Sequence, residues 1–404
     1  MPEAVIVSAA RTPIGRANKG SLKEFRPDDL TAFIAKAALD KVLALDPNEV
    51  DDFLLGCGLP GGESGNNMAR VVTSLMGYEI PGATITRYCS SSVQTSRMAF
   101  HAIKAGEGDV FISAGVETVS RFQFGTSDHI PNTKNPLFED AQQRTQEYAQ
   151  GGQDWHDPRE DGLLPDIYIA MGQTAENVAR MRGLKREDLD HFGVRSQNLA
   201  EKAINDGFWE REITPVTLAD GTVVSSDDGP RAGVTYDAVK DLKPVFRPDG
   251  VVTAANCCPL NDGAAAVVIM SDTKAAELGL TPLARIVSTG VSGLSPEIMG
   301  LGPVEASRNA LRYAGMTIDD IDLVEINEAF AAQVLPSAED LGVDMDKLNV
   351  NGGAIAIGHP FGMTGARLQN TMLNSLQWHD KSTGLITMCV GGGQGMAMIL
   401  ERIA

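Results

Sequence analysis

The segment RYCSSSVQTSRMAF carries a thiol, Cys89, directly before a run whose apolar residues have helical spacing. The N-terminus of a helix exposes unpaired N–H groups and a positive dipole, and both lower the pKa of a nearby thiol. We therefore expect Cys89 to be a nucleophile at the start of a helix. A buried, unreactive cysteine is the alternative that this segment alone leaves open.

Polar or reactive residues also occupy three other segments that are rich in small residues. His359 lies in the glycine-dense segment NGGAIAIGHPFGMTG, either as a base or as a hydrogen-bonded turn residue. Cys389 and Gly391 lie in MCVGGGQG, where the glycines let backbone N–H groups approach a ligand and form an oxyanion site. Asn327 lies in INEAFAAQ between a strand and a helix, where its default role is an N-cap.

The composition limits the possible partners. The chain has 404 residues, of which 43% are hydrophobic, so two or three domains with substantial cores are expected. The net charge of -19 argues against nucleic acid or an anionic membrane as a partner. The first apolar run lacks basic residues ahead of it, and no run is long enough to cross a bilayer, so we expect no membrane insertion and a cytoplasmic location. The five cysteines include no CxxC pair, which indicates neither a disulfide framework nor a thiolate metal site.

Buried strands that alternate with helices must position these segments. The apolar pattern predicts strands over residues 4–7, 53–55, 84–86 and 110–115, and a helix over residues 30–45. Such alternation is typical of a parallel or mixed sheet that is covered on both faces. The segments LDPNEVDDFLLGCG and GMTIDDIDLVEINEAF both run through paired aspartates into a buried strand, so the second half appears as a repeat of the first.

A long segment interrupts this plan between the two halves. Residues 121–165 are polar and turn-rich, and helical patterns follow over residues 171–182 and 187–207. Long loops in compact domains are usually functional, so we interpret this segment as an inserted lid. The predicted domains are an N-terminal half of residues 1–120 and 249–275, an inserted lid of residues 121–248, and a C-terminal half of residues 276–404.

Taken together, these segments give the sequence a recognisable family pattern. It resembles the thiolases, the acyl-CoA acetyltransferases that make and cleave 3-ketoacyl-CoA. The match runs from Val5 to Ile403 through segments in family order, which are ARTPIG, RYCSSSVQ, SAGVETVS, MGQTAENVA, VVTAANCCPLNDGAAA, INEAFA, NGGAIAIGHPFGMTGAR and MCVGGGQG. The resemblance implies a duplicated, layered α/β-α/β-α fold in which the inserted loop domain binds CoA.

The resemblance also implies a role for each reactive residue. Cys89 would be the acyl-accepting nucleophile, with His359 as its base, and Cys389 would be the acid/base at the α-carbon or at the leaving thiol. Asn327 would hold a water that joins the histidine in one oxyanion hole, and the N–H groups of Cys89 and Gly391 would form the other. The residues that match substrate-contacting positions are Met171, Phe246, Ala254, Cys258, Met299 and Phe330 near the acyl and pantetheine channel, and Arg231 near the nucleotide end of CoA.

Several residues depart from the usual thiolase pattern. Ser90 and Ser92 replace glycines that follow the nucleophile, and we expect these serines to cap the helix. Ala170 stands where short-chain members carry a histidine before Met171, and Cys258 replaces a common serine. These changes leave the preferred acyl length open.

Two other readings compete with a thiolase. A ketoacyl synthase shares the duplicated fold but lacks a second catalytic cysteine, whereas this chain has Cys389. A catalytically inactive CoA- or lipid-binding relative would be expected to lose one of the four reactive residues. We therefore expect a thiolase that runs thiolysis or the reverse condensation, with CoA as substrate and product and with no metal or other cofactor. The resemblance also implies a homodimer, and contacts between dimers through the long insert would make a homotetramer.

Overall fold

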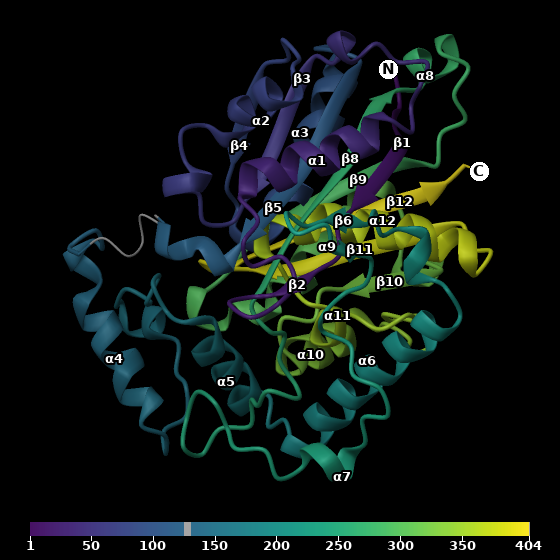
Figure 1. The fold of residues 1–404 in the computed structure, drawn as a ribbon. Coiled ribbons are helices and arrows are strands. Elements are labelled where there is room, and N and C mark those ends of the chain that lie inside the picture. The colour runs from purple at the N-terminus through teal and green to yellow at the C-terminus, as the bar shows by residue number, and fades with distance from the viewer. Residues whose placement is uncertain (125–130, 404) are drawn as a thin grey trace.

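The computed structural model describes residues 1–124 and 131–403 of the chain (Figure 1). Residues 125–130, which belong to the predicted insert, and Ala404 lie outside the described residues. The strands are β1 (Ala4–Arg11), β2 (Gly15–Arg16), β3 (Asp52–Cys57), β4 (Gly82–Ile85), β5 (Val110–Thr118), β6 (Val216–Thr217), β7 (Val223–Val224), β8 (Asn261–Ser271), β9 (Ala284–Gly293), β10 (Leu323–Ile326), β11 (Thr383–Val390) and β12 (Gln394–Arg402). The α-helices are α1 (Pro27–Leu39), α2 (Met68–Met76), α3 (Ser91–Ala105), α4 (Glu139–Ala149), α5 (Met171–Met181), α6 (Arg186–Asn205), α7 (Tyr236–Val239), α8 (Asp272–Glu277), α9 (Gly302–Ala314), α10 (Ala331–Leu341), α11 (Ala354–Ile357) and α12 (Phe361–Trp378).

The sheet repeats one arrangement of strands in its two halves. Its order is β10-β11-β12-β9-β1-β8-β5-β3-β4, and β2 pairs with β8. In one half, β3 runs parallel to β5, which pairs antiparallel with β8, and β8 pairs antiparallel with β1. In the other half, β10, β11, β12 and β9 repeat these relations in the same order. The pairing of β1 with β9 joins the halves, so the predicted duplication is confirmed.

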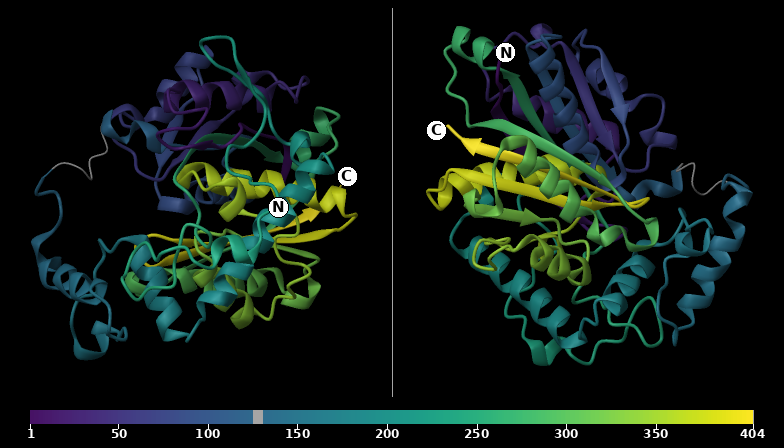
Figure 2. Two further views of the ribbon diagram at one scale, coloured as in Figure 1. Left: turned by 60° about the horizontal axis from the view of Figure 1, so that its bottom comes forward. Right: turned by 180° about the vertical axis from the view of Figure 1, so that it is seen from behind.

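Helices cover the sheet in layers, because each helix packs its apolar face against the strands. Helix α1 packs on β5 and β8 from outside, and α9 packs on β9 and β12 (Figure 2). Helices α3 and α12 pack on each other and on strands of the sheet between these outer layers. Of the 18 residues of α12, 14 are buried, as expected for a helix with a sheet half on either side. The layered α/β-α/β-α fold is therefore confirmed.

Most elements predicted from the sequence are present. The strands expected over residues 4–7, 53–55, 84–86 and 110–115 are β1, β3, β4 and β5. The helices expected over 171–182 and 187–207 are α5 and α6, and the helix expected over 30–45 is α1, which ends at Leu39. Strand β5 reads VFISAGVET and is buried throughout, as strands covered on both faces are.

The inserted segment contains a helix that the sequence did not reveal. Residues 121–165 were expected to be turn-rich, but α4 occupies Glu139–Ala149. Its sequence, EDAQQRTQEYA, buries only Ala141 among its residues, so it has no apolar stripe that periodicity could detect. Farther along the insert, α5 and α6 pack against α10 of the C-terminal half (Figure 1). The proposed domain boundaries stay a prediction.

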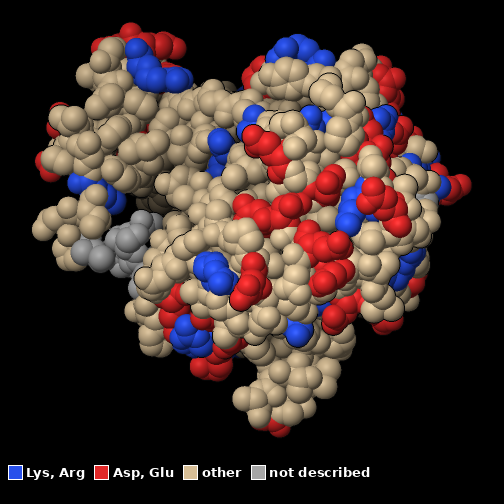
Figure 3. Space-filling view, turned by 90° about the horizontal axis from the view of Figure 1, so that it is seen from above, with Lys and Arg blue, Asp and Glu red and all other residues tan. Residues whose placement is uncertain are grey.

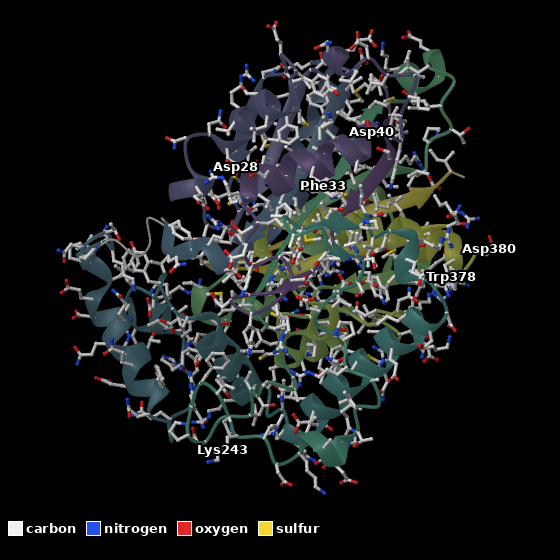
Figure 4. The ribbon with its side chains drawn as sticks, viewed as in Figure 1. Asp28, Phe33, Asp40, Lys243, Trp378 and Asp380 are labelled. Carbon is white, nitrogen blue, oxygen red and sulfur yellow. The ribbon has the colours of Figure 1, made fainter. Side chains whose placement is uncertain are left out.

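The surface carries charges of both signs. Acidic and basic side chains are interspersed over the face shown in Figure 3. Helix α1 lies at the surface of the N-terminal half, where Asp28, Phe33 and Asp40 are labelled (Figure 4). Trp378 and Asp380 lie at the periphery, just at the C-terminal end of α12, whereas His359 before its N-terminal end is buried. None of the described helices is long and apolar enough to cross a membrane.

Candidate active site

Cys89 lies in a strained turn at the entrance to a helix. The 3₁₀ turn η3 (Tyr88–Ser90) leads directly into α3 and packs against α12 and β11. Tyr88 has a φ of +43°, which bulky residues rarely adopt. The backbone N–H of Gly391, in the turn after β11, donates a hydrogen bond to the Cys89 sulfur. The structure therefore brings together two segments that the sequence separates by about 300 residues.

The expected low pKa of Cys89 is wrong. Burial, aided by a smaller effect of the Glu117 carboxylate, raises the pKa of Cys89 to about 12 despite the hydrogen bond from the Gly391 N–H. The helix N-terminus favours a thiolate only as a partial charge, whereas removal from water penalises the whole charge. Cys89 therefore needs a proton acceptor at the moment it reacts.

Two further thiols lie close to Cys89. Cys389, at the end of β11, is buried, and its pKa is raised well above the usual range by burial and then by the charge of Cys89. Cys258 interacts electrostatically with both of them, and burial likewise raises its pKa. All five cysteines belong to the described residues and are free thiols, so Cys257 and Cys258 form no disulfide.

His359 is held as a neutral imidazole. Its Nδ1 lies 2.6 Å from the Thr364 hydroxyl, which itself donates to the Pro360 carbonyl at 2.7 Å. Because that hydroxyl proton is already used, Thr364 accepts from Nδ1–H, and the lone pair stays on Nε2. Burial, followed by the charge of Arg367, lowers the pKa of His359 to about 3. The side chain is therefore a neutral imidazole with its lone pair on Nε2.

Asn327 is oriented from both sides of its amide. Its Nδ2 lies 3.4 Å from each ring nitrogen of His359, and its Oδ1 accepts from Arg367 Nη2 at 3.4 Å. Asn327 is not the N-cap that the sequence suggested, since α10 begins only at Ala331 with Phe330 as its N-cap. The amide is instead free to face the imidazole.

The expected capping by serines is also wrong. The N-cap of α3 is Ser90, but no serine side chain caps the helix. Ser90 Oγ donates to the Arg87 carbonyl at 3.1 Å, and Ser91 Oγ donates to the Tyr88 carbonyl at 2.6 Å. Ser92 Oγ contacts another helix, with a distance of 2.6 Å to the Gly362 carbonyl of α12. The three serines therefore donate to carbonyl groups around Cys89.

A cavity of about 530 Å³ opens beside Cys89. Its walls come from the nucleophile turn, the turn after β11, the insert and the start of α12. The lining residues are Gly58, Leu59, Tyr88, Cys89, Thr133, Lys134, Ile167, Tyr168, Ile169, Met171, Phe361, Gly391 and Gly392. The ring of Phe361 packs edge-on against His359, with centroids 5.4 Å apart, so the imidazole lies directly behind this wall.

The predicted substrate contacts divide into two groups. One apolar cluster contains Met299, Phe330 and Cys389, and Met171, Phe246 and Cys258 pack against it. Within it, the rings of Phe246 and Phe330 meet edge-on at 6.2 Å. Among the residues predicted as substrate contacts, only Met171 also lines the cavity.

Two predicted contacts lie outside this cluster. Arg231 is exposed in a loop, where its backbone N–H donates to Gln197 Oε1 at 2.9 Å, and Ala254 is exposed as well. Neither residue lines the cavity. Their contact with CoA stays a prediction.

Three buried residues behind the site were not identified from the sequence. Thr364 fixes the tautomer of His359, Arg367 fixes the amide of Asn327, and Glu117 lies close enough to Cys89 to raise its pKa. Glu117 ends the buried run SAGVE, and a charged residue in such a run is the one signal that was available. The other two occur one helical turn apart in MTGAR, with no pattern that marks them.

One thiol that lines a cavity, a second thiol close to it, and an imidazole and an amide buried behind the cavity wall form the kind of site that acyl-transferring enzymes use. The thiolase N-terminal domain matches residues 4–273, and the thiolase C-terminal domain matches residues 280–402. The chain therefore belongs to the thiolase family.

Individual relatives cover the whole chain. It is 41% identical to a 3-ketoacyl-CoA thiolase of Bacillus subtilis, over 99% of this chain and 100% of the relative. It is 42% identical to an acetyl-CoA acetyltransferase of Escherichia coli, over 100% of both. The crystal structure of the dimeric peroxisomal thiolase of Saccharomyces cerevisiae superposes with a TM-score of 0.88 at 33% identity, and covers 99% of this chain and 98% of that one.

Proposed function

We propose that the protein cleaves 3-ketoacyl-CoA with CoA, or runs the reverse condensation, through an acyl group held on Cys89. The observation that carries this proposal is the contact between the Cys89 sulfur and the Gly391 N–H, which sets the nucleophile beside Cys389 at a cavity wall. The names of the two relatives, a 3-ketoacyl-CoA thiolase and an acetyl-CoA acetyltransferase, support the same substrate class.

In the cleavage direction, the reaction begins at the 3-keto carbon. The Cys89 sulfur attacks this carbon as its proton passes to His359 Nε2, and the bond between C2 and C3 breaks. The electron pair of that bond stays on C2 as the enolate of acetyl-CoA, which takes a proton from Cys389. An N–H such as that of Gly391 and the Asn327 amide would stabilise the oxygen charges that develop.

The second half of the reaction regenerates the thiol. The sulfur of free CoA gives its proton to the Cys389 thiolate and attacks the acyl carbon on Cys89. The acyl–sulfur bond to Cys89 then breaks, and Cys89 recovers the proton that His359 held. Two thiols and one imidazole thus balance every proton, and the proposed reaction uses CoA as substrate and product without a metal or redox cofactor.

Acetylation of the protein tests this function. Incubation with acetyl-CoA is expected to add one acetyl group at Cys89, detected by intact mass and located by peptide mapping. Cys389→Ala is the matched control, because it should still be acetylated at Cys89 yet lose both cleavage and condensation. Label that persists in Cys89→Ala would refute the assignment, and near-normal turnover by Cys389→Ala would refute the role of the second thiol.

We propose further that acyl chains longer than four carbons are substrates. The cavity beside Cys89 has several apolar walls, including Leu59, Ile169 and Phe361. Met299, which would crowd a short-chain pocket, is buried in the neighbouring cluster and does not line the cavity. Each buried CH₂ group contributes about 0.8 kcal/mol, so such walls favour longer chains.

We also propose that the protein acts as a homo-oligomer in the cytoplasm. Strand β4 ends the sheet and pairs only with β3 among the described strands, so one edge is open. Apolar side chains are exposed on the adjacent α2, including Val71 and Leu75, which is 52% exposed. The yeast thiolase is dimeric, and a two-fold contact through this edge would be isologous. A homotetramer would need an additional contact, for which the insert is the candidate.

A further inference from the structure

Gly362 lies three residues after His359, in the first turn of α12. N–H groups in the first turn of a helix have no partner within the helix. The N–H of Gly362 donates to Glu117 Oε2 at 2.9 Å, and its carbonyl accepts from Ser92 Oγ at 2.6 Å. Both ends of this one residue are therefore bound by side chains from the N-terminal half.

Ser92 is inserted into the hydrogen-bond ladder of α12. Its Oγ donates to the Gly362 carbonyl and accepts from the Ala366 N–H at 2.8 Å. In an uninterrupted α-helix these two groups, four residues apart, would bond to each other. Ser92 lies three residues after Cys89, so this hydroxyl links the helix that begins at the nucleophile to the helix that begins at the base.

Glu117 extends the link to the cavity wall. The oxygen that binds Gly362 also accepts from the Gly58 N–H at 2.8 Å, and the other oxygen accepts from the Leu59 N–H at 3.3 Å. Gly58 and Leu59 line the cavity beside Cys89. One carboxylate therefore ties the segment after His359 to the wall against which the nucleophile lies.

The packing around Gly362 leaves this segment no room to shift. A Cβ atom on Gly362 would lie 2.2 Å from the Val116 carbonyl oxygen. A Cβ atom on Gly115 would lie 2.1 Å from the Gly362 carbonyl oxygen. Residues 115 and 362 must both be glycine, so the backbone of α12 packs directly on the backbone of β5. The hydrogen bonds from Glu117 and Ser92 to Gly362 therefore hold a rigid contact.

We propose that Glu117 and Ser92 are positioning residues for acyl transfer, which hold Gly362 from its two ends and thereby fix His359 relative to Cys89. This proposal rests on the proposed thiolase function. It gives a role to Ser92, which stands where the family pattern has glycine.

The ionisation of Glu117 distinguishes a role in positioning His359 from a role in stabilising the fold. Burial raises the pKa of Glu117 to about 7, against the hydrogen bonds from the three N–H groups. When folding raises the pKa of a carboxyl group, the free energy of unfolding falls as pH rises from the unfolded pKa to the folded pKa. Ionised Glu117 therefore does not stabilise the fold. The titratable groups that interact with it are Cys57 and Cys89, and burial raises the pKa of both thiols.

The test compares Glu117→Gln, Ser92→Ala and the double variant in steady-state cleavage of 3-ketoacyl-CoA. Because a misplacement of about 1 Å at a reacting pair costs about 100-fold, Glu117→Gln should lower kcat by about 100-fold with KM nearly unchanged. Ser92→Ala should lower kcat by about tenfold, because it removes the hydrogen bonds from Ser92 to α12 but leaves those of Glu117. Both side chains bind one residue, so the double variant should lose much less than the product of the single losses.

Asp322→Asn is the matched control. Asp322 also accepts two backbone N–H groups from another segment, those of Ser382 and Thr383, at 2.9 Å and 3.0 Å. Asp322 lies just before β10, which pairs in parallel with β11. Asn327 and Cys389 lie at the opposite, C-terminal ends of these two strands. Despite partial burial, the pKa of Asp322 is lowered by its hydrogen bonds, so Asp322→Asn should lower Tm, whereas its kcat should stay at the wild-type value.

The pH profile of kcat/KM gives a second readout that a purely structural role would not move. The wild-type profile should include an ionisation near the pKa of Glu117, about 7, and this ionisation should be absent in Glu117→Gln. A Glu117→Gln variant with wild-type kcat, or with a loss that only follows its loss of Tm, would overturn the proposal. If Glu117→Gln does not fold, a wild-type kcat in Ser92→Ala alone overturns it.

Failure of the proposed function gives a different result. In that case wild-type protein is not acetylated at Cys89, whatever residues 92 and 117 are. If Cys89 is acetylated in the wild type and at the same rate in both single variants, the thiolase function holds and the positioning role is refuted.

Discussion

At neutral pH we expect Cys89 to be a neutral thiol that loses its proton only as it attacks a thioester. Burial raises its pKa to about 12. At pH 8 the thiolate would then make up about one part in 10⁴ of the protein. Burial also lowers the pKa of His359 to about 3, so the imidazole is neutral over the same range. We therefore expect the proton of Cys89 to pass to Nε2 during the attack, with no stable ion pair beforehand.

The assay follows thiolate absorbance in the ultraviolet from about pH 6 to about pH 10, and Cys89→Ala protein supplies the blank. The difference should show no titration midpoint below 9.0, the ordinary value for a thiol. In the same range, the rate of Cys89 alkylation should rise about tenfold for each pH unit, since only the scarce thiolate reacts. A plateau in that rate, or a midpoint below about 7, would show a preformed thiolate and refute this reasoning.

Three further predictions concern stability, substrate length and assembly. The pKa of His359 is about 3 in the folded protein and 6.5 in the unfolded chain. Its contribution to the free energy of unfolding is therefore fully present above pH 6.5 and is lost as pH falls toward 3. From pH 7 to pH 4 this loss is about 3 kcal/mol, and urea unfolding should show it in wild type but not in His359→Asn. In thiolysis, kcat/KM for a six-carbon substrate should at least equal that for a four-carbon substrate, and a drop of more than about tenfold would show a closed pocket. Light scattering at micromolar concentration should give a dimer or tetramer, and substituting Leu75 by Glu should weaken it, whereas a stable monomer in the wild type would contradict the assembly.

The parts of the fold that sequence reasoning predicted are those with strong apolar patterns. Strand β5 and helix α5 carry such patterns, and both occur where they were expected. Helix α4 was missed because it is polar on all sides and buries only Ala141. The duplication was visible because paired aspartates lie at or just before the start of β3 in one half and of β10 in the other.

The reactive residues were identifiable, but their local environments were not. The segments around Cys89 and His359 were singled out by residue type and by resemblance. The pKa of Cys89 was expected in the wrong direction, because a helix N-terminus can be inferred from sequence whereas burial against the turn after β11 cannot. For the same reason, Ser92 was expected to cap a helix, and an N-cap was the default role of Asn327 before the resemblance implied an oxyanion hole. Their actual partners, Arg367 and Gly362, lie 40 and 270 residues away.

The burial that disfavours the Cys89 thiolate also makes the Cys389 thiolate a strong base. Cys389 is more deeply buried than Cys89, and burial raises the pKa of its thiol well above the usual range. A thiolate with a higher pKa is a stronger base, and removing a proton from the α-carbon of a thioester demands a strong base. Attack on a thioester carbonyl demands less, because the sulfur that attacks and the sulfur that leaves have similar basicity. We therefore expect the deeper thiol, Cys389, to act on carbon and the more accessible thiol, Cys89, which lines the cavity, to carry the acyl group.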